Sequence, residues 1–112
     1  MIRAAGTDLV TDADFETTVL GAGLPVLVEF TADWCGPCRQ LAPVLSTIAK
    51  EEAERLTVVQ IDVDNNPETT VRYGVLSTPT LMLFRQGRPI ASLVGARSGR
   101  QLRRELAAAL TD

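Results

Sequence analysis

The most informative part of the sequence is the stretch Pro25-Val26-Leu27-Val28-Glu29-Phe30-Thr31-Ala32-Asp33-Trp34-Cys35-Gly36-Pro37-Cys38. Its first half is nearly all apolar and rich in β-branched residues, which is typical of a strand covered on both faces. From Cys35 to about Glu54, apolar side chains recur at helical spacing, so we expect one face of a helix to be buried. The stretch therefore predicts a buried strand followed by an amphipathic helix that begins at two cysteines.

Strand and helix patterns alternate on both sides of this stretch. The further elements that we expect are a strand near residues 5–10, a short helix begun by Thr11 or Asp12, a strand over 57–63, a short helix from Pro67, a hairpin of strands 80–84 and 90–94, and a last helix capped by Ser98. Helices between the early strands imply parallel crossovers, and the hairpin adds antiparallel strands. The order βαβαβαββα predicts an α/β fold with a mixed central sheet flanked by helices on both faces, as one domain over residues 1–112.

The composition indicates a mildly acidic globular protein. Of the 112 residues 46% are apolar, and the net charge of −3 argues against nucleic acid binding, which calls for a basic balance. Six of the eleven cations, all arginine, lie in residues 85–112 and predict either a solvated helix surface or a basic docking face. The first residues lack the apolar core of a signal peptide, and no apolar run approaches the ~18 residues that span a bilayer. We therefore expect a cytoplasmic protein with no membrane contact.

The two cysteines are three residues apart, which on a helix brings both sulfurs to one face, close enough for a disulfide. A purely structural disulfide would stabilise little, because it closes a very short loop, and a reducing compartment disfavours it. A structural zinc site needs four ligands, whereas the chain has no histidine and no third cysteine. Only a metal or cluster shared between two chains would remain, so we expect no metal and interpret the pair as a redox couple.

The helix start assigns different roles to the two sulfurs. The helix dipole and the free backbone N–H groups at a helix N-terminus lower the pKa of a cysteine there, so Cys35 is the expected attacking thiolate. Cys38 lies one turn deeper and is the expected resolving thiol, which breaks the mixed disulfide. Gly36 lets the backbone turn tightly, Pro37 is tolerated in the first helical turn, and the two help to set the redox potential.

With these features the chain resembles the thioredoxin family over nearly its whole length. The resemblance rests on stretches that follow one another in the family's order: Val26-Leu27-Val28-Glu29-Phe30, Ala32-Asp33-Trp34-Cys35-Gly36-Pro37-Cys38, Leu41-Ala42-Pro43, Val63-Asp64-Asn65-Asn66-Pro67, Tyr73-Gly74-Val75, Thr78-Pro79-Thr80-Leu81, Phe84-Arg85-Gln86-Gly87 and Val94-Gly95-Ala96. It implies the thioredoxin fold, reduction of protein disulfides without a bound cofactor, and re-reduction by an NADPH-linked thioredoxin reductase.

The resemblance also implies a docking surface for substrate beside the cysteines. In the family the proline that matches Pro79 is cis, and an X-Pro bond adopts the cis form at little cost. The backbone of Thr78 then pairs with the substrate chain, whereas the alternative is an ordinary trans proline that opens a strand. The docking residues expected around the exposed sulfur of Cys35 are Trp34, Gly36, Pro37, Gly74, Thr78, Pro79, Gly95 and Ala96.

Glu29 interrupts an apolar strand, where a carboxylate is costly unless it is paired or protonated. The family's best-known members have Asp at this place, behind the second cysteine, so the resemblance assigns Glu29 as proton acceptor for Cys38, with a pKa raised by burial. The alternative is a strand residue on an exposed edge. Two neighbours also depart from the family pattern: Thr31 replaces a frequent tryptophan, and Gln60 replaces a lysine that often accompanies the acid.

We expect a monomeric electron carrier that reduces protein disulfides, and two other functions remain as alternatives. The first is a binding module in which the redox chemistry is incidental, but retention of both cysteines and the acid argues against it. The second is an oxidase or isomerase of the same fold. Oxidising members often place a histidine between the cysteines, and this chain has no histidine.

Overall fold

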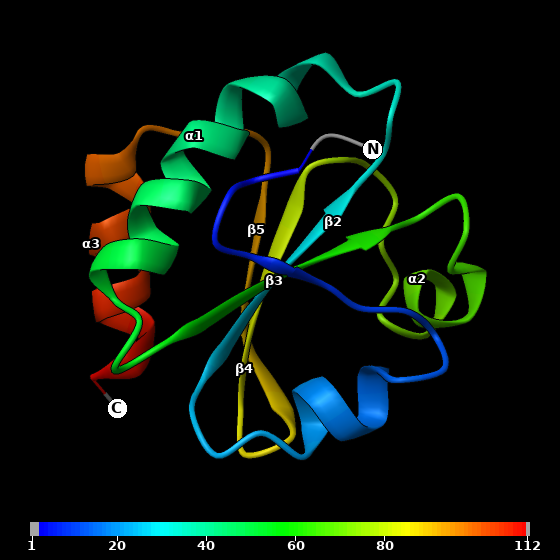
Figure 1. The fold of residues 1–112 in the computed structure, drawn as a ribbon, viewed down its shortest axis with the longest axis horizontal. Helices are drawn as coiled ribbons and strands as arrows, with labels where there is room; N and C mark the ends of the chain where they lie inside the picture. Colours follow the sequence, from blue (N-terminus) through cyan, green and yellow to red (C-terminus); the bar gives the residue numbers. More distant parts are fainter. Residues whose placement is uncertain (1–2, 112) are drawn as a thin grey trace.

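A five-stranded sheet lies at the centre of the structure, a computed structural model that describes residues 3–111 (Figure 1). Over these residues the strands follow the order β1-β3-β2-β4-β5 across the sheet. β1 and β2 run parallel to β3, whereas β4 runs antiparallel to β2 and β5, which confirms the predicted mixed sheet. The strands are β1 (Asp8–Leu9), β2 (Val26–Thr31), β3 (Thr57–Asp62), β4 (Thr80–Arg85) and β5 (Arg88–Val94).

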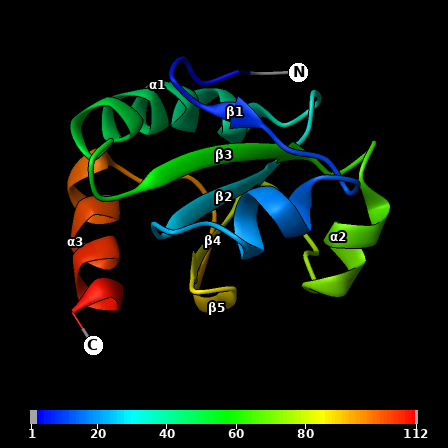
Figure 2. The same ribbon diagram turned by 60° about the horizontal axis from the view of Figure 1, so that its bottom comes forward.

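Helices cover both faces of the sheet, as predicted. They are the π-helix η1 (Glu16–Leu20) and the α-helices α1 (Gly36–Glu51), α2 (Pro67–Arg72) and α3 (Gly99–Leu110). α1 and α3 lie against one face, and η1 and α2 lie against the other (Figures 1 and 2). None of the helices described over residues 3–111 combines the length and apolar content that crossing a bilayer requires.

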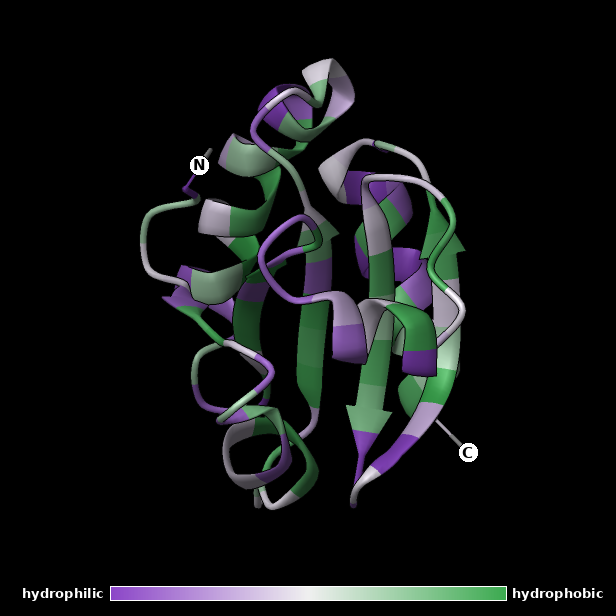
Figure 3. Cartoon of the chain, turned by 90° about the vertical axis from the view of Figure 1, so that its right-hand side faces the viewer, coloured by the Kyte–Doolittle hydropathy of each residue, from purple (hydrophilic) through white to green (hydrophobic). Residues whose placement is uncertain are grey.

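The sheet separates two hydrophobic clusters. On one side, Leu27 and Leu81 of the sheet pack with Leu41, Leu45 and other side chains of α1 and α3. On the other side, Val26, Val28 and Phe30 alternate with Leu27 and pack around η1 and the rings of Phe15, Tyr73 and Phe84. Figure 3 shows the strands between these layers mostly in the hydrophobic colour. Because side chains alternate along a strand, Glu29 lies on the same face as Leu27, the face that α1 covers.

The β4–β5 hairpin turns at Gln86 and Gly87, which both have positive φ angles, of 52° and 77°. Two such residues make a tight turn whose twist matches that of the strands, and glycine suits the second position. The strands extend closer to the turn than predicted, to Arg85 and from Arg88. Pro89 lies in β5, and the register shifts between Leu83 and Phe84 of β4.

The N-terminal segment differs from the prediction in two respects. The strand expected near residues 5–10 is limited to Asp8–Leu9. Asp12 does not cap the short helix that follows it, and η1 begins after Phe15 without a side-chain cap. Instead, the carboxylate of Asp12 accepts hydrogen bonds from the backbone N–H groups of Thr69 at 2.9 Å and Glu68 at 3.2 Å, in the first turn of α2. Desolvation acts to raise the pKa of Asp12, but these hydrogen bonds together lower it below its ordinary value. In contrast, Ser98 caps α3 as predicted, accepting from the N–H of Gln101.

Candidate active site

Cys35 and Cys38 lie at the N-terminal end of α1. Cys35 is the N-cap residue, and its Sγ accepts a hydrogen bond from the backbone N–H of Cys38 at 3.2 Å. Pro37 falls in the first turn, where its missing N–H leaves no gap in the hydrogen-bond pattern. The two sulfurs are bonded, with the Cα atoms 5.3 Å apart. When the bond is reduced, the partial positive charge of the helix end favours a thiolate at Cys35.

Both cysteines are almost fully buried in this disulfide form. Cys35 is 2% exposed and Cys38 is 1% exposed, so the expectation of an exposed Cys35 sulfur is wrong for the oxidised protein. The two sulfurs are bonded to each other, and both side chains pack with Ala32. Trp34 is instead exposed beside the pair, and its indole Nε1 donates to the Asp64 carboxylate at 2.8 Å.

Glu29 lies in the central strand of the sheet, with Gln60 of β3 on one side and Leu81 of β4 on the other. Its side chain is buried, which shows that the alternative of an exposed edge position is wrong. Burial raises the pKa of Glu29 from 4.5 to about 7, although the hydrogen bond from Gln60 acts to lower it. A carboxyl with this pKa changes its protonation state near neutral pH.

Cys38 and Glu29 belong to the same layer of the structure. Cys38, Leu41 and Leu45 lie at helical spacing on the buried side of α1, and the two leucines pack on the sheet face that carries Glu29. The predicted proton acceptor and the predicted resolving thiol therefore share one buried face.

The surroundings of Pro79 contain several of the predicted docking residues. The Thr78–Pro79 bond is cis, as the resemblance implied, and the alternative of a trans proline is wrong. The Pro79 carbonyl accepts from the N–H of Gly95 at 2.9 Å, which ties these two predicted residues together. Trp34 and Thr78 line one hollow of about 110 Å³, and Gly74 lines a neighbouring one of about 260 Å³. Ala96 is exposed next to Gly95 and lines neither hollow.

Leu76 is a candidate docking residue that the sequence reasoning missed. Its side chain is 97% exposed, and it lines both of these hollows together with Val75 and Ser77. A large apolar residue between Gly74 and Pro79, in a segment with no predicted helix or strand, was the signal in the sequence. Val94 adds a second exposed apolar side chain at the larger hollow.

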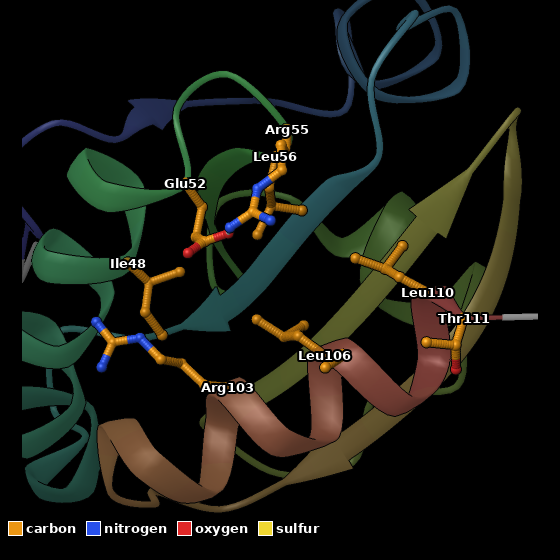
Figure 4. A pocket seen from close by; sticks show the side chains of 9 residues that line it. Ile48, Glu52, Arg55, Leu56, Arg103, Leu106, Leu110 and Thr111 are labelled. Carbon is orange, nitrogen blue, oxygen red and sulfur yellow. The ribbon is translucent and has the colours of Figure 1, made fainter.

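A further hollow, of about 460 Å³, lies far from the cysteines (Figure 4). It is formed where the C-terminal end of α1 meets α3, with Ile48, Leu56 and Leu106 among its lining residues. Cys35 lies at the opposite end of α1, and a helix of this length separates its two ends by ~24 Å. Arg103 at the rim pairs with Glu51, and Arg97 Nε lies 2.9 Å from Glu105 Oε1. Part of the basic charge of residues 85–112 is thus paired within the chain.

The comparison with known proteins agrees with this geometry. The family model described as Thioredoxin matches residues 6–108. Thioredoxin of Mycobacterium tuberculosis is 53% identical over 102 residues, covering 91% of this chain and 88% of that protein. Thioredoxin of Mycolicibacterium smegmatis is 48% identical over 112 residues, covering 98% of this chain and all of that protein. The bifunctional thioredoxin reductase/thioredoxin of Mycobacterium leprae is 49% identical over 104 residues, which are 93% of this chain and 23% of that protein.

Proposed function

Because this chain belongs to the thioredoxin family, we propose that Cys35 and Cys38, assisted by Glu29, carry out its dithiol–disulfide exchange. The chain is a thiol–disulfide oxidoreductase, a protein-disulfide reductase of the thioredoxin type. The observation that carries the assignment of residues is the bonded cysteine pair at the N-terminus of α1, in the same buried layer as Glu29.

The first step joins the carrier to its substrate. The Cys35 thiolate attacks one sulfur of a substrate disulfide, forming a bond between Cys35 and that sulfur while the substrate's other sulfur leaves as a thiolate. Gly36 and Pro37 shape the helix start that stabilises the Cys35 thiolate. In the reduced state the Cys35 sulfur is no longer bonded to Cys38, so it is able to turn outward toward the substrate.

The second step releases the product. The Cys38 thiol gives its proton to the Glu29 carboxylate, and the resulting thiolate attacks Cys35, forming the intramolecular disulfide and expelling the substrate sulfur as a second thiolate. Forming this disulfide oxidises the two cysteines by two electrons, which are the two electrons that reduce the substrate disulfide, and the substrate thiolates take up protons from Glu29 and water. The pKa of Glu29, about 7, suits a group that must accept a proton and release it again near neutral pH.

Docking is assigned to the surface that surrounds Trp34 and Pro79. We include Trp34, Gly74, Thr78, Pro79, Gly95 and Ala96, as predicted, and add Leu76. The two hollows that Leu76 lines, and the hydrogen bond from Gly95 to Pro79, support a continuous apolar surface here. An extended substrate segment would lie across it, with the backbone of Thr78 available for pairing.

An NADPH-linked thioredoxin reductase is the proposed partner that reduces the disulfide again. The family implies such a partner, and the relative from Mycobacterium leprae carries both names in one protein. We further propose that the chain acts as a single domain over residues 1–112, as a monomer in the cytoplasm, where it supports electron transport and redox homeostasis.

The test is insulin disulfide reduction with NADPH and a thioredoxin reductase. We expect Cys35→Ser to abolish turnover and Cys38→Ser to accumulate a mixed disulfide with the substrate, detectable by mass. Glu54→Gln, at an exposed position, is the control and should turn over normally. Normal turnover by Cys38→Ser would contradict the two-cysteine mechanism. A potential on the order of −120 mV rather than roughly −270 mV would instead assign an oxidase.

A further inference from the structure

The two carboxyl oxygens of Glu29 have different surroundings. Oε1 accepts a hydrogen bond from Nε2 of Gln60 at 2.8 Å. Oε2 is buried and has no hydrogen-bond partner among residues 3–111. A buried oxygen left without a partner is costly, so in a native structure it calls for a functional or structural reason.

We propose that Gln60 is a positioning residue, which occupies Oε1 of Glu29 and so leaves Oε2 as the oxygen that receives the proton from Cys38. This inference rests on the proposed role of Glu29. Gln60 touches neither cysteine in the described contacts and would act only through the carboxyl group that it holds. Its amide is neutral and therefore orients Glu29 without adding a cation at this site.

Gln60 is itself held in one orientation by the N-terminal segment. Its side chain is buried, and its Oε1 accepts from the backbone N–H of Ala4 at 3.0 Å and the Thr7 hydroxyl at 3.1 Å. Turning the amide over would bring its NH2 group against the Ala4 N–H and its oxygen against the Glu29 carboxylate. Both of these contacts would then lose their donor–acceptor match, so the Ala4 N–H determines which end of Gln60 faces Glu29. The Thr7 hydroxyl, which also donates to the Ala4 carbonyl, adds a second contact at the same end of Gln60.

Few other ionisable groups face this carboxyl. On its own strand the neighbours of Glu29 on this face are Leu27 and Thr31, and on β4 the neighbour is Leu81. Thr31 is buried and polar, but none of these three side chains is ionisable near neutral pH. On β3, Asp62 lies two residues beyond Gln60 and is buried as well. From α1, the titratable group is the thiol of Cys38 once the disulfide is reduced. The Gln60 hydrogen bond is therefore the nearest described contact that favours the ionised form of Glu29.

The direction of the expected effect follows from this contact. A hydrogen bond donated to a carboxylate stabilises the charged form, and it lowers the pKa of Glu29 against the larger effect of burial. Removing it should raise that pKa further. A smaller fraction of Glu29 is then ionised at neutral pH. In a plot of the resolution rate against pH, the acid limb, where the rate falls as the pH is lowered, therefore moves to higher pH.

The experiment measures the rate of substrate thiol release from the mixed disulfide between pH 5 and 9. The key variant is Gln60→Met, which keeps the shape and removes the amide. We expect its acid limb to move up by about one pH unit, which is about a tenfold slower release on that limb, with the plateau at high pH retained. Thr7→Val, which removes one anchor of Gln60, should produce a smaller shift in the same direction. Thr69→Val is the matched control, because Thr69 is as buried as Thr7 but lies in α2, and its acid limb should not move.

The outcomes separate this inference from the proposed function. Two results would remove the basis of both the proposed function and this inference. The first is a wild-type protein that reduces no disulfide, and the second is a Glu29→Gln variant that retains the acid limb of the wild type. An acid limb that disappears in Glu29→Gln but stays in place in Gln60→Met would overturn the role of Gln60 alone. That role would also be overturned if Gln60→Met slowed release equally at every pH, because such a loss is a structural effect. If Gln60→Met does not fold, the shift or absence of a shift in Thr7→Val decides.

Discussion

Replacing Glu29 by glutamine should remove a specific pH dependence from the stability of the oxidised protein. Burial keeps the pKa of Glu29 at about 7 in the folded state, whereas the unfolded chain would titrate near the ordinary value of 4.5. At about 1.4 kcal/mol per pH unit, this difference between the folded and unfolded pKa of Glu29 contributes about 3 kcal/mol to the free energy of unfolding. Because the folded pKa is the higher one, this stability is fully present below pH 4.5 and is lost as the pH rises through 7.

The assay is urea unfolding of the oxidised wild type and Glu29→Gln at pH 4.5 and pH 8. Glutamine carries no proton to lose, so the variant should gain about 3 kcal/mol relative to wild type between these two pH values. Glu54→Gln, at an exposed position, serves as the control and should gain much less. A difference between Glu29→Gln and wild type that stays constant with pH would refute the assignment of a raised pKa to this buried carboxyl.

Three further predictions concern packing, capping and docking. Leu45→Ala removes a fully buried side chain between α1 and the sheet. It should lower the free energy of unfolding, measured in urea, by about 2–5 kcal/mol. A decrease below about 1 kcal/mol would contradict the packing described. Asp12→Ala removes the acceptor for two N–H groups of α2 and should lower the urea concentration at the midpoint of unfolding. Asp14 is exposed and accepts from Thr11, so Asp14→Ala serves as the comparison that leaves the first turn of α2 capped. Leu76→Ser should lower kcat/KM for protein disulfides about fivefold while leaving stability within about 0.5 kcal/mol. An equal loss with a small-molecule disulfide would show that Leu76 does not act through docking.

Local patterns in the sequence predicted most of the fold. A nearly continuous apolar run identified β2, alternating apolar residues identified β3, and helical spacing of apolar residues identified α1 and α3. The Ser98 cap followed from its place before the last helix. The cysteine spacing located the redox pair, and the resemblance supplied the cis bond before Pro79. These features depend on residues that are close together in the chain, or on a motif that a family shares.

Contacts between distant segments could not be predicted in the same way. Asp12 caps a helix that begins more than 50 residues later, and nothing near Asp12 in the sequence indicates that choice. Gln60 was noticed only as a departure from the family pattern, because its hydrogen bonds to Ala4 and Glu29 exist only once β1, β3 and β2 are aligned. The burial of Cys35 was missed because it depends on how the oxidised pair packs with Ala32.

The hairpin that ends the sheet has a consequence for how separate molecules meet. β5 pairs with β4 on one side only, so among the described strands it leaves an open row of backbone groups that another chain could extend. Pro89 supplies no N–H to such a row, and the register shift between Leu83 and Phe84 disturbs the regular ladder beside it. At the far edge, β1 is only two residues long. Both borders of the sheet are thus poor templates for edge-to-edge aggregation, which suits a protein that acts on disulfides of other protein chains.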